Sequence, residues 1–567
     1  MGNMNYIRNI LLLGTLSVLF SMSSQASDIE QIKAVEKMTS FGKIKQAFSQ
    51  GKINKGEIIL HNLQAALEPE KLPQEYKIAE ITPVKSATPF ILDAVNNWEL
   101  LSPAEKSQVS AYLFRPVLDS TYMSPDGHFA IHYNISFPDS TPIDDLDESG
   151  FPDYVERVAV YADSAYRYYQ ESLGYLPPPP DFDGIYDIYL VSLGYTYGLT
   201  SPDQTGDSSW NDYTSFMKIN CSMLSVYDNQ DPEGDIIGAV KVTCVHEFFH
   251  ATQFAYDVSE ELWWMECTAT AFEDILYSEV KDNYQYLPYF FDHPDSSMNS
   301  GPFSCYGAFV WPLYLINRYD VGIIKNIFEY ARFYDALESI DSALVPYSTD
   351  MNVAYPEFTV WNYFTGDRSN GSHYPHGNDL PYMPWDQTLA NYPFTAITPV
   401  TAPDGLGCNY LISHPDPMPE GLLKLHFDGA SSATWRFSYI LFNDDEFTEV
   451  VDCPMDQYER AFTAVYDYTR YDSMVFIPSV VSLTGEAHYY SFYTEILPFG
   501  DLNGNGDVNL ADILYLISYI YTKGPAPIGG AVSADVDCDG LENLSDILYL
   551  IINVYNEGPD PCIYYPD

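Results

Sequence analysis

The chain has 567 residues and carries 26 Lys+Arg against 79 Asp+Glu, so its formal net charge is −53 at pH 7. This charge disfavours a nucleic-acid binder or an electrostatic membrane anchor, because phosphates and anionic lipids attract basic side chains. The length predicts two to four domains. A hydrophobic fraction of 46% with 19% charged residues indicates a folded chain rather than a disordered one.

The first 26 residues have the pattern of a signal peptide. Arg8 precedes the apolar stretch Ile10–Phe20, and Ser24–Ala26 offers small residues for cleavage. The apolar stretch is too short to span a membrane, and an uncleaved N-terminal anchor is the alternative. No later stretch is long and apolar enough to cross a bilayer. We therefore expect a secreted, extracellular protein, either in solution or associated with the cell surface.

The net charge is distributed unevenly along the chain. Of the 26 basic and 79 acidic residues, 12 and 11 fall in residues 1–116, which leaves 14 and 68 for residues 117–567. Residues 27–116 contain no Cys and predict helices over Ile32–Phe48 and Leu100–Leu113. Two interpretations of 27–116 stay open: a pro-region that covers an acidic cleft, and an N-terminal helical subdomain that stays attached.

Strands and helices are mixed in the predicted domain 117–391. The apolar pattern predicts strands over Phe129–Ile135 and Ile185–Val191, and an amphipathic helix over Tyr154–Leu173. Another helix is predicted to begin near Asp235. This mixture predicts an α+β fold.

An acidic segment in this domain has the spacing of a calcium loop. Asp145, Asp147 and Ser149 alternate, Gly150 follows, and Glu156 comes six residues after the glycine. In EF-hand-like loops, alternate oxygens bind Ca²⁺, glycine makes the turn, and a final carboxylate completes the shell. The alternative is an acidic turn that caps the following helix.

The strongest chemical signal is His246-Glu247-Phe-Phe-His250, which follows the apolar run Ile236–Val245. On a helix, positions i and i+4 share a face, so both imidazoles can bind one Zn²⁺. Glu247 then lies beside the metal-bound water and can serve as general base and general acid. The pattern HExxHxxGxxH is absent, because Tyr256 stands where its third histidine would be.

A catalytic zinc site needs a third protein ligand. The next helical pattern, 262–274, contains Glu266, and Glu273 two turns later is the rival ligand. A donor that stabilises the developing oxyanion should also face the metal. Tyr306 and His293 are candidates for that role.

These motifs resemble a known class of enzymes. HEFFHATQFAYD followed by WWMECTATAFED is similar to the gluzincins, and closest to secreted bacterial metalloproteases with the pattern HEFFHAxQFAYD … WWMEGTATWxED. The resemblance covers roughly residues 117–390. It implies a zincin fold, with His246, His250 and Glu266 as zinc ligands and Glu247 as base. Cys267 replaces the glycine of the pattern, which hints at a local disulfide, for instance to Cys305.

Residues 392–498 predict an antiparallel β-sandwich, because apolar residues alternate between Gly, Pro and Asp turns. No catalytic cluster is evident there, so we expect an accessory domain that acts as a spacer or binds substrate. The alternating residues are Leu423, Leu425, Phe427, Trp435, Phe437, Tyr439, Tyr490 and Phe492.

Residues 499–567 contain an internal repeat at an offset of 34 residues, in which each copy joins a calcium-loop pattern to an apolar helix. The repeat resembles a type I dockerin domain, which implies Ca²⁺-dependent folding and a cohesin-like partner. A calcium-stabilised cap without a partner is the alternative. The predicted ligands are Asp501, Asn503, Asn505, Asp507 and Asp512 in the first loop and Asp535, Asp537, Asp539, Leu541 and Asp546 in the second.

All eight cysteines lie after residue 220. An even number in an exported chain favours disulfides. Pairing of neighbours is the simplest hypothesis, because each pair then stays within one predicted domain. The expected pairs are 221–244, 267–305, 408–453 and 538–562.

The sequence therefore predicts a multidomain protein: a signal peptide, an N-terminal segment, an α+β zincin metalloprotease domain, a β-sandwich and an α-helical dockerin-like calcium domain. The predicted function is a secreted zinc metallopeptidase that cleaves protein or peptide substrates, uses Zn²⁺ and Ca²⁺, and docks through its C-terminus. The alternative is a calcium-dependent extracellular adhesion or scaffold protein with a vestigial zinc site.

Overall fold

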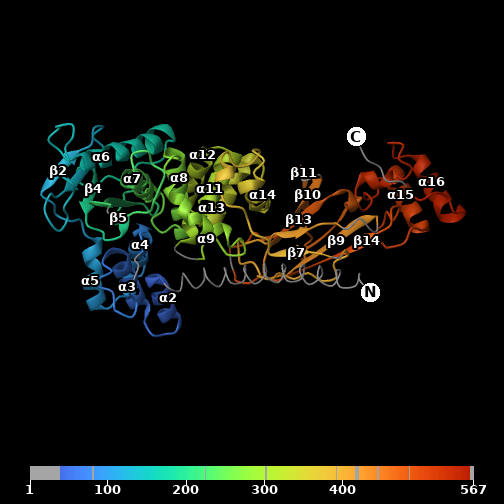
Figure 1. Cartoon of the computed structure of the whole chain (residues 1–567), viewed down its shortest axis with the longest axis horizontal. Coiled ribbons are helices and arrows are strands. Elements are labelled where there is room, and N and C mark those ends of the chain that lie inside the picture. The colour runs from blue at the N-terminus through green and yellow to red at the C-terminus, as the bar shows by residue number, and fades with distance from the viewer. Residues whose placement is uncertain are drawn as a thin grey trace, which may run out of the picture. The chain divides into compact units, whose positions relative to one another are not determined.

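The computed structural model describes residues 39–78, 82–223, 225–300, 303–390, 392–415, 420–443, 446–483 and 485–561. The predicted signal peptide lies outside these residues. The chain divides into two compact units, Met1–Asp282 with Phe328–Asp335, and Asn283–Ile327 with Ala336–Asp567. The architecture is multidomain and α+β, with several sheets (Figure 1). Within the described part, no helix is long and apolar enough to cross a membrane.

The first unit contains a six-stranded mixed sheet in the order β1-β5-β6-β4-β3-β2. β3, β4 and β6 run parallel, while β5 and β2 are antiparallel to their neighbours β6 and β3; β1 pairs with β5 in parallel. The strands predicted over Phe129–Ile135 and Ile185–Val191 are β3 and β4. The strands are β1 (Val84–Ser86), β2 (Ser120–Met123), β3 (Phe129–Tyr133), β4 (Tyr186–Val191), β5 (Thr196–Thr205) and β6 (Tyr213–Asn220).

One face of this sheet packs against α7 (Asp235–Gln253). Phe248 of this helix makes edge contacts with Phe129 and Tyr186, with ring centroids 4.9 and 5.6 Å apart. The helix predicted over Tyr154–Leu173 is α6 (Asp153–Tyr166), which continues as a π-helical turn, and α8 (Leu262–Leu276) packs against α7. The HExxH motif therefore lies on a helix that packs against a sheet on one side and against other helices elsewhere.

The N-terminal segment covers the opposite face. Successive strand residues point to opposite sides of a sheet, so Tyr189 and Val191 face away from Tyr186. They share a hydrophobic cluster with helical residues such as Leu63 and Ile91. The segment thus belongs to the core of the first unit. Its helices are α2 (Ser40–Ser49), α3 (Lys55–Leu67), α4 (Thr88–Asn96) and α5 (Pro103–Leu113).

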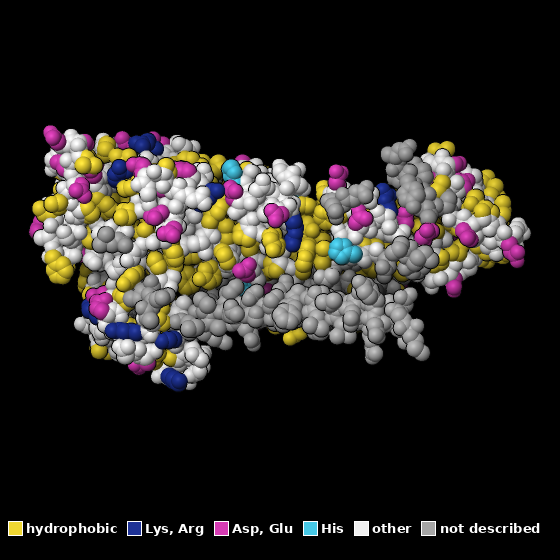
Figure 2. Space-filling model, viewed as in Figure 1, with side chains coloured by type: hydrophobic (Ala, Val, Ile, Leu, Met, Phe, Trp, Pro, Cys, Tyr) yellow, Lys and Arg dark blue, Asp and Glu magenta, His cyan; other side chains and the backbone are white. Residues whose placement is uncertain are grey.

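The N-terminal segment keeps the charge character seen in the sequence. Figure 2 shows several Lys and Arg side chains, in dark blue, over α2–α5.

The helix predicted over Leu100–Leu113 is α5. Of the helix predicted over Ile32–Phe48, the described part is α2.

The second unit joins a helical part to two further sheets. The five-stranded sheet has the order β11-β10-β13-β8-β7 and the three-stranded sheet the order β12-β9-β14. The apolar residues that alternate in the sequence, such as Phe427 and Phe437, fill one core shared by both sheets, with these two rings stacked 4.8 Å apart. This is the sandwich arrangement predicted by the alternation, with β7 pairing in parallel to β8.

The α-helices of this part of the second unit are α9 (Leu287–Phe291), α10 (Ser304–Gly307), α11 (Val310–Arg318), α13 (Ala336–Leu344) and α14 (Met351–Tyr363). Its strands are β7 (Gln387–Leu389), β8 (Leu411–Ser413), β9 (Leu422–Gly429), β10 (Trp435–Asn443), β11 (Glu446–Cys453), β12 (Arg460–Val465), β13 (Ser473–Val480) and β14 (Tyr490–Leu497). Helix α12 (Gly322–Ala331) contains residues of both units.

The disulfide hypothesis is wrong for three of its four pairs. Cys221, Cys244, Cys267, Cys305, Cys408 and Cys453 are buried thiols. Residues 267 and 305 fall in different compact units, so this pair does not stay within one unit. Burial raises the pKa of the Cys221 and Cys408 thiols to about 11 and about 12, so they act as small apolar groups. Cys538 is disulfide-bonded, and its predicted partner Cys562 lies outside the described residues.

A buried carboxyl just before α8 couples the first unit to pH. Glu260 is 4% exposed, and burial, with the charges of Asp257 and Asp335 adding to it, raises its pKa to about 8. The unfolded chain loses this proton near the usual value of 4.5. The folded state therefore binds more protons between these two values, and its stability falls as the pH rises through that interval.

We predict that Glu260→Gln removes this pH dependence. The contribution of Glu260 to the free energy of unfolding should fall by at most about 1.4 kcal/mol per pH unit between pH 4.5 and 8. Urea denaturation should measure this as a difference in the free energy of unfolding, variant minus parent. That difference should be more positive at pH 8 than at pH 5. An equal difference at both pH values would contradict the assignment.

Candidate metal centre and calcium loops

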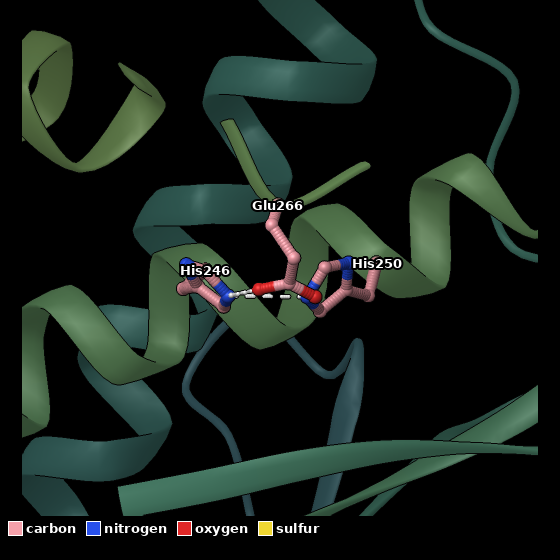
Figure 3. A group of neighbouring side chains, drawn as sticks. All are labelled: His246, His250 and Glu266. Atoms are coloured by element: carbon pink, nitrogen blue, oxygen red, sulfur yellow. Dashed lines mark hydrogen bonds and ion pairs between the residues drawn. The ribbon is translucent and has the colours of Figure 1, made fainter. Parts of the chain in front are cut away.

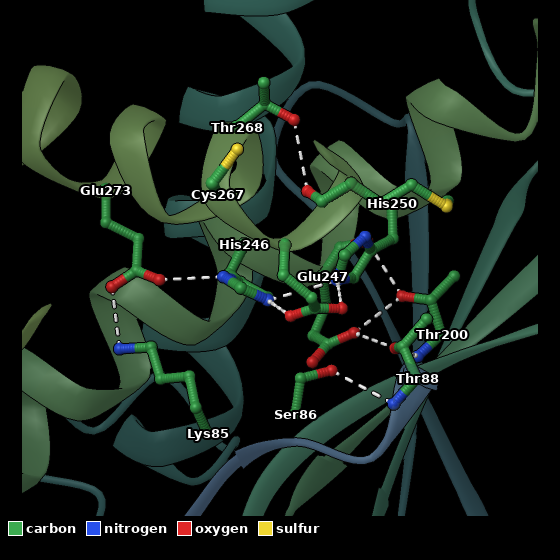
Figure 4. A network of polar contacts seen from close by, with 12 residues as sticks. Lys85, Ser86, Thr88, Thr200, His246, Glu247, His250, Cys267, Thr268 and Glu273 are labelled. Atoms are coloured by element: carbon green, nitrogen blue, oxygen red, sulfur yellow. Dashed lines mark hydrogen bonds and ion pairs between the residues drawn. The ribbon is translucent and has the colours of Figure 1, made fainter. Parts of the chain in front are cut away.

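Helix α7 carries the HExxH motif through the interior of the first unit. His246, Glu247 and His250 are 0–1% exposed. The four-residue spacing places both imidazoles on one face, with their Nε2 atoms 3.1 Å apart (Figure 3). Glu247 projects from the neighbouring position toward the sheet (Figure 4).

Helix α8 brings Glu266 to the same point. Its Oε2 lies 3.2 Å from His246 Nε2 and its Oε1 lies 3.2 Å from His250 Nε2. A tetrahedral metal ion that holds nitrogen and oxygen at its usual bond lengths separates its ligand atoms by about 3.3 Å. The three residues therefore fit a tetrahedral metal ion such as zinc, and among the described residues this group supplies three of its four ligands.

Hydrogen bonds on the far side of each ring support this assignment. His246 Nδ1 lies 2.8 Å from Glu273 Oε1, and His250 Nδ1 lies 2.7 Å from Gln253 Oε1. The Gln253 amide nitrogen donates to the Met265 carbonyl (2.9 Å), so its oxygen must accept from His250. Both rings thus carry a proton on Nδ1 and direct Nε2 at each other, which requires a cation or a shared proton between them.

The pKa values of Glu266 and His246 are both shifted by their mutual contacts. Burial alone would raise the pKa of Glu266, but the charge of His250 and hydrogen bonds from both histidines lower it to about 2. Burial would lower the pKa of His246, but its hydrogen bonds to Glu266 and Glu273 raise it to about 10. Both directions favour the ionised carboxylate and the charged imidazole, so opposite charges are paired inside the centre.

Glu247 is held by one oxygen only. Its Oε2 accepts hydrogen bonds from the hydroxyls of Thr88 (2.9 Å) and Thr200 (2.8 Å), as Figure 4 shows. Its buried Oε1 has no hydrogen-bond partner among the described residues. Gly198 lets β5 approach the helix, because a Cβ there would lie 2.9 Å from Glu247 Cγ. The carboxylate is therefore fixed in place with one oxygen available.

Sequence reasoning missed four residues of this centre and misplaced a fifth. Glu273, the rival ligand, contacts Nδ1 of His246 and not the three converging ligand atoms. Gln253 lies three residues after His250 on the same helix, a spacing that could have indicated its role. Thr88, Thr200 and Lys85 come from distant segments, and no local pattern marks them. Lys85 contacts Glu273 at 2.6 Å.

The two candidates for the oxyanion donor, Tyr306 and His293, belong to the second compact unit. The role of either residue stays a prediction.

The upstream acidic loop gathers a slightly different set from the predicted one. Carboxylate oxygens of Asp145, Asp147 and Asp153 lie within 4.8 Å of one another. The Ser149 backbone N–H donates to Asp145 (2.9 Å) and Asp147 (3.0 Å). Glu156, predicted to complete the shell, is not part of this group among the described residues, and Asp153, the first residue of α6, takes its place.

The first C-terminal loop wraps around Asp501. Its carboxylate accepts backbone hydrogen bonds from Gly504 (2.8 Å), Asn505 (3.1 Å) and Gly506 (2.7 Å). At the other end, Asp512 accepts from the Asn503 side chain (2.7 Å), and the Asp507 carbonyl accepts from Asn509 Nδ2 (3.3 Å). Helix α15 (Leu510–Thr522) begins after Asn509, whose side chain caps it.

The second loop repeats this geometry at an offset of 34 residues. Oxygens of Asp535, Asp537 and Asp539 lie within 4.8 Å of one another. Asp546 accepts from the Asn543 backbone (2.8 Å), and the Leu541 carbonyl accepts from Asn543 Nδ2 (2.9 Å). Helix α16 (Leu544–Asn556) follows. The core between the loops is equally symmetric, with Leu502, Ile513 and Leu516 matched by Val536, Ile547 and Leu550.

Comparison with known proteins identifies this last part. No curated protein matches the chain. The family model of the type I dockerin domain matches residues 499–554, which span both loops and nearly all of both helices. Type I dockerin domains bind calcium, dock onto cohesins and are typical of extracellular cellulosome components. The chain therefore carries a C-terminal type I dockerin domain.

Proposed function

We propose that the protein is an extracellular zinc-dependent metallopeptidase that is attached to a cohesin partner through its dockerin domain. The observation that carries the proposal is the convergence of His246 Nε2, His250 Nε2 and the Glu266 carboxylate at separations of 3.1–3.2 Å. Three protein ligands and an open position are the composition of a catalytic zinc site, whereas structural zinc sites use four protein ligands.

Each group around the site has its own role in the proposed hydrolysis. Zinc, when bound, polarises water and the substrate carbonyl. Glu247 accepts the proton of the attacking water on its unpartnered Oε1 and later delivers it to the leaving amine. Thr88 and Thr200 hold Oε2, so the carboxylate does not need to reorient between the two steps. Gln253 and Glu273 keep both imidazoles oriented toward the metal.

One observation favours the second candidate function. All four groups of the centre are 0–1% exposed, and a peptide can reach them only when the site opens. A calcium-dependent adhesion or scaffold protein with a vestigial zinc site has no need of such access. Measurement of hydrolysis therefore decides between the two functions.

The docking function rests on the dockerin domain and on its surface. Its two helices expose apolar side chains at equivalent positions of the repeat, which Figure 2 shows in yellow. Exposed apolar residues that recur on one module are typical of interaction surfaces. The residues matched at the offset of 34 are Leu510, Leu514 and Tyr521 in the first copy and Leu544, Leu548 and Tyr555 in the second, each 50–59% exposed.

We predict that Glu247→Gln lowers casein hydrolysis by a factor of about 100 or more, because the amide cannot accept the proton. Zinc content, measured by atomic absorption, should stay at the level of the parent protein, since Glu247 is not a ligand. Glu260→Gln, which changes another buried carboxyl of the same unit, is the control and should keep its activity. Retained hydrolysis in Glu247→Gln, or a chelator-insensitive activity, would exclude this mechanism.

We predict that each dockerin loop binds one Ca²⁺. Asp501→Ala and Asp535→Ala should each remove one bound ion in calorimetric titration of the full chain. Each of these carboxylates is the first predicted ligand of its loop. The double variant should no longer be captured by an immobilised type I cohesin. Asp560→Ala, an exposed residue beyond α16, is the control. Calcium binding that survives in the double variant would show that the loops are not the sites.

A further inference from the structure

The segment before α4 contacts the metal centre at two points. Lys85 is the middle residue of β1, and Thr88 is the first residue of α4. The Lys85 ammonium contacts Glu273 and Asp282, and Thr88 contacts Glu247. Both side chains come from the stretch 84–88, which lies within the predicted segment 27–116.

The first contact is a buried ionic relay. Lys85 Nζ lies 2.6 Å from Glu273 Oε2, and the other oxygen of Glu273 lies 2.8 Å from His246 Nδ1. Lys85, Glu273 and Asp282 are each at most 1% exposed. One carboxylate thus joins the lysine to the zinc-ligand ring (Figure 4).

Lys85 is needed to neutralise the buried carboxylates around it. Glu273 and Asp282 both contact Lys85, and Glu266 lies on the other side of the His246 ring, at Nε2. A buried carboxylate that loses its cationic partner is strongly destabilised in its buried position. Displacement of Glu273 would break its contact with His246 Nδ1, so the ring would no longer be held in its present orientation.

The second contact reaches the proposed base. The Thr88 hydroxyl donates to Glu247 Oε2 (2.9 Å) and accepts from the Thr200 backbone N–H (2.8 Å). The Ser86 hydroxyl accepts from the Thr88 backbone N–H (3.1 Å). Ala87 and Ile91 are fully buried in the cluster beneath the sheet. Apolar packing therefore holds the segment in the position where its polar side chains meet the centre.

We propose that Lys85 is a positioning residue of the metal centre, and that residues 84–88 are a permanent part of it rather than a removable cover. Through Glu273, Lys85 holds His246 with Nε2 directed at Glu266 and His250. The proposal rests on the proposed zinc site but not on the reaction that occurs there. It favours, for this stretch, the attached subdomain over the pro-region.

The test compares Lys85→Met with Lys241→Met in the full secreted chain. Lys241 is a second buried lysine of the same unit, on α7 itself, and pairs with Asp231 (2.8 Å) and Glu233 (3.4 Å). Zinc affinity is measured by competition with a chromophoric chelator. The visible absorption of the Co²⁺-substituted protein reports ligand geometry. Lys85→Met should bind zinc about 10- to 100-fold more weakly and change the Co²⁺ spectrum, while Lys241→Met should change neither.

A fallback variant covers the case in which Lys85→Met does not fold. Lys85→Met/Asp282→Asn removes one charge of each sign, and it should fold and still bind zinc more weakly with an altered Co²⁺ spectrum. Parent-like affinity and spectrum in either Lys85 variant, or an equal loss in Lys241→Met, would overturn the proposal. Because the readouts are metal binding and geometry, they decide the role of Lys85 even if casein is not cleaved.

We also predict where the mature chain begins. N-terminal sequencing of zinc-loaded secreted protein should find a start before Val84, because later starts remove β1. A zinc-loaded mature protein that begins at or after Val84 would overturn the proposal, whatever its peptidase activity.

Discussion

The first unit depends on one constraint, namely that the polar side chains buried in α7 must find partners. An unpaired polar group in the interior costs several kcal/mol, and an unpaired charge costs more. His246, Glu247 and His250 are all buried, so each requires hydrogen bonds from another element. These partners come from α8, from β5 and from the start of α4. The position of each element is therefore set by polar contacts as well as by apolar packing.

The apolar faces of α7 are compatible with this requirement. Phe248 packs on the sheet, while Phe249 contacts Phe272 of α8 with ring centroids 4.5 Å apart. Adjacent residues on a helix point in different directions, so the two aromatic rings anchor the helix on faces other than the one that carries the histidines. Rigid packing on both sides holds the imidazoles in a fixed orientation, which is the condition for a preorganised metal site.

The parts of the protein that could be predicted from the sequence are those whose residues recur at a regular spacing over a short stretch. The i, i+4 histidines and the dockerin repeat follow from spacing alone, as do β3, α6 and the alternating strands of the sandwich. The sequence could not show that Glu273 contacts Nδ1 of His246, because the ring atom that it meets depends on how α8 packs. It could not place Lys85 or Thr88, whose partners lie 197 and 159 residues away. Three of the four predicted disulfides failed for the same reason, since pairing depends on tertiary distances.

These separations have a consequence for how the first unit folds. Contacts between residues far apart in the chain require long loops to close before they stabilise anything, and such topologies fold slowly. The strand that carries Lys85 joins β5 only after more than a hundred intervening residues have been arranged. The helix with the two histidines is local in sequence, but the partners of its polar side chains are not. A metal bound at the proposed centre would therefore meet a complete ligand set only after this non-local packing has formed.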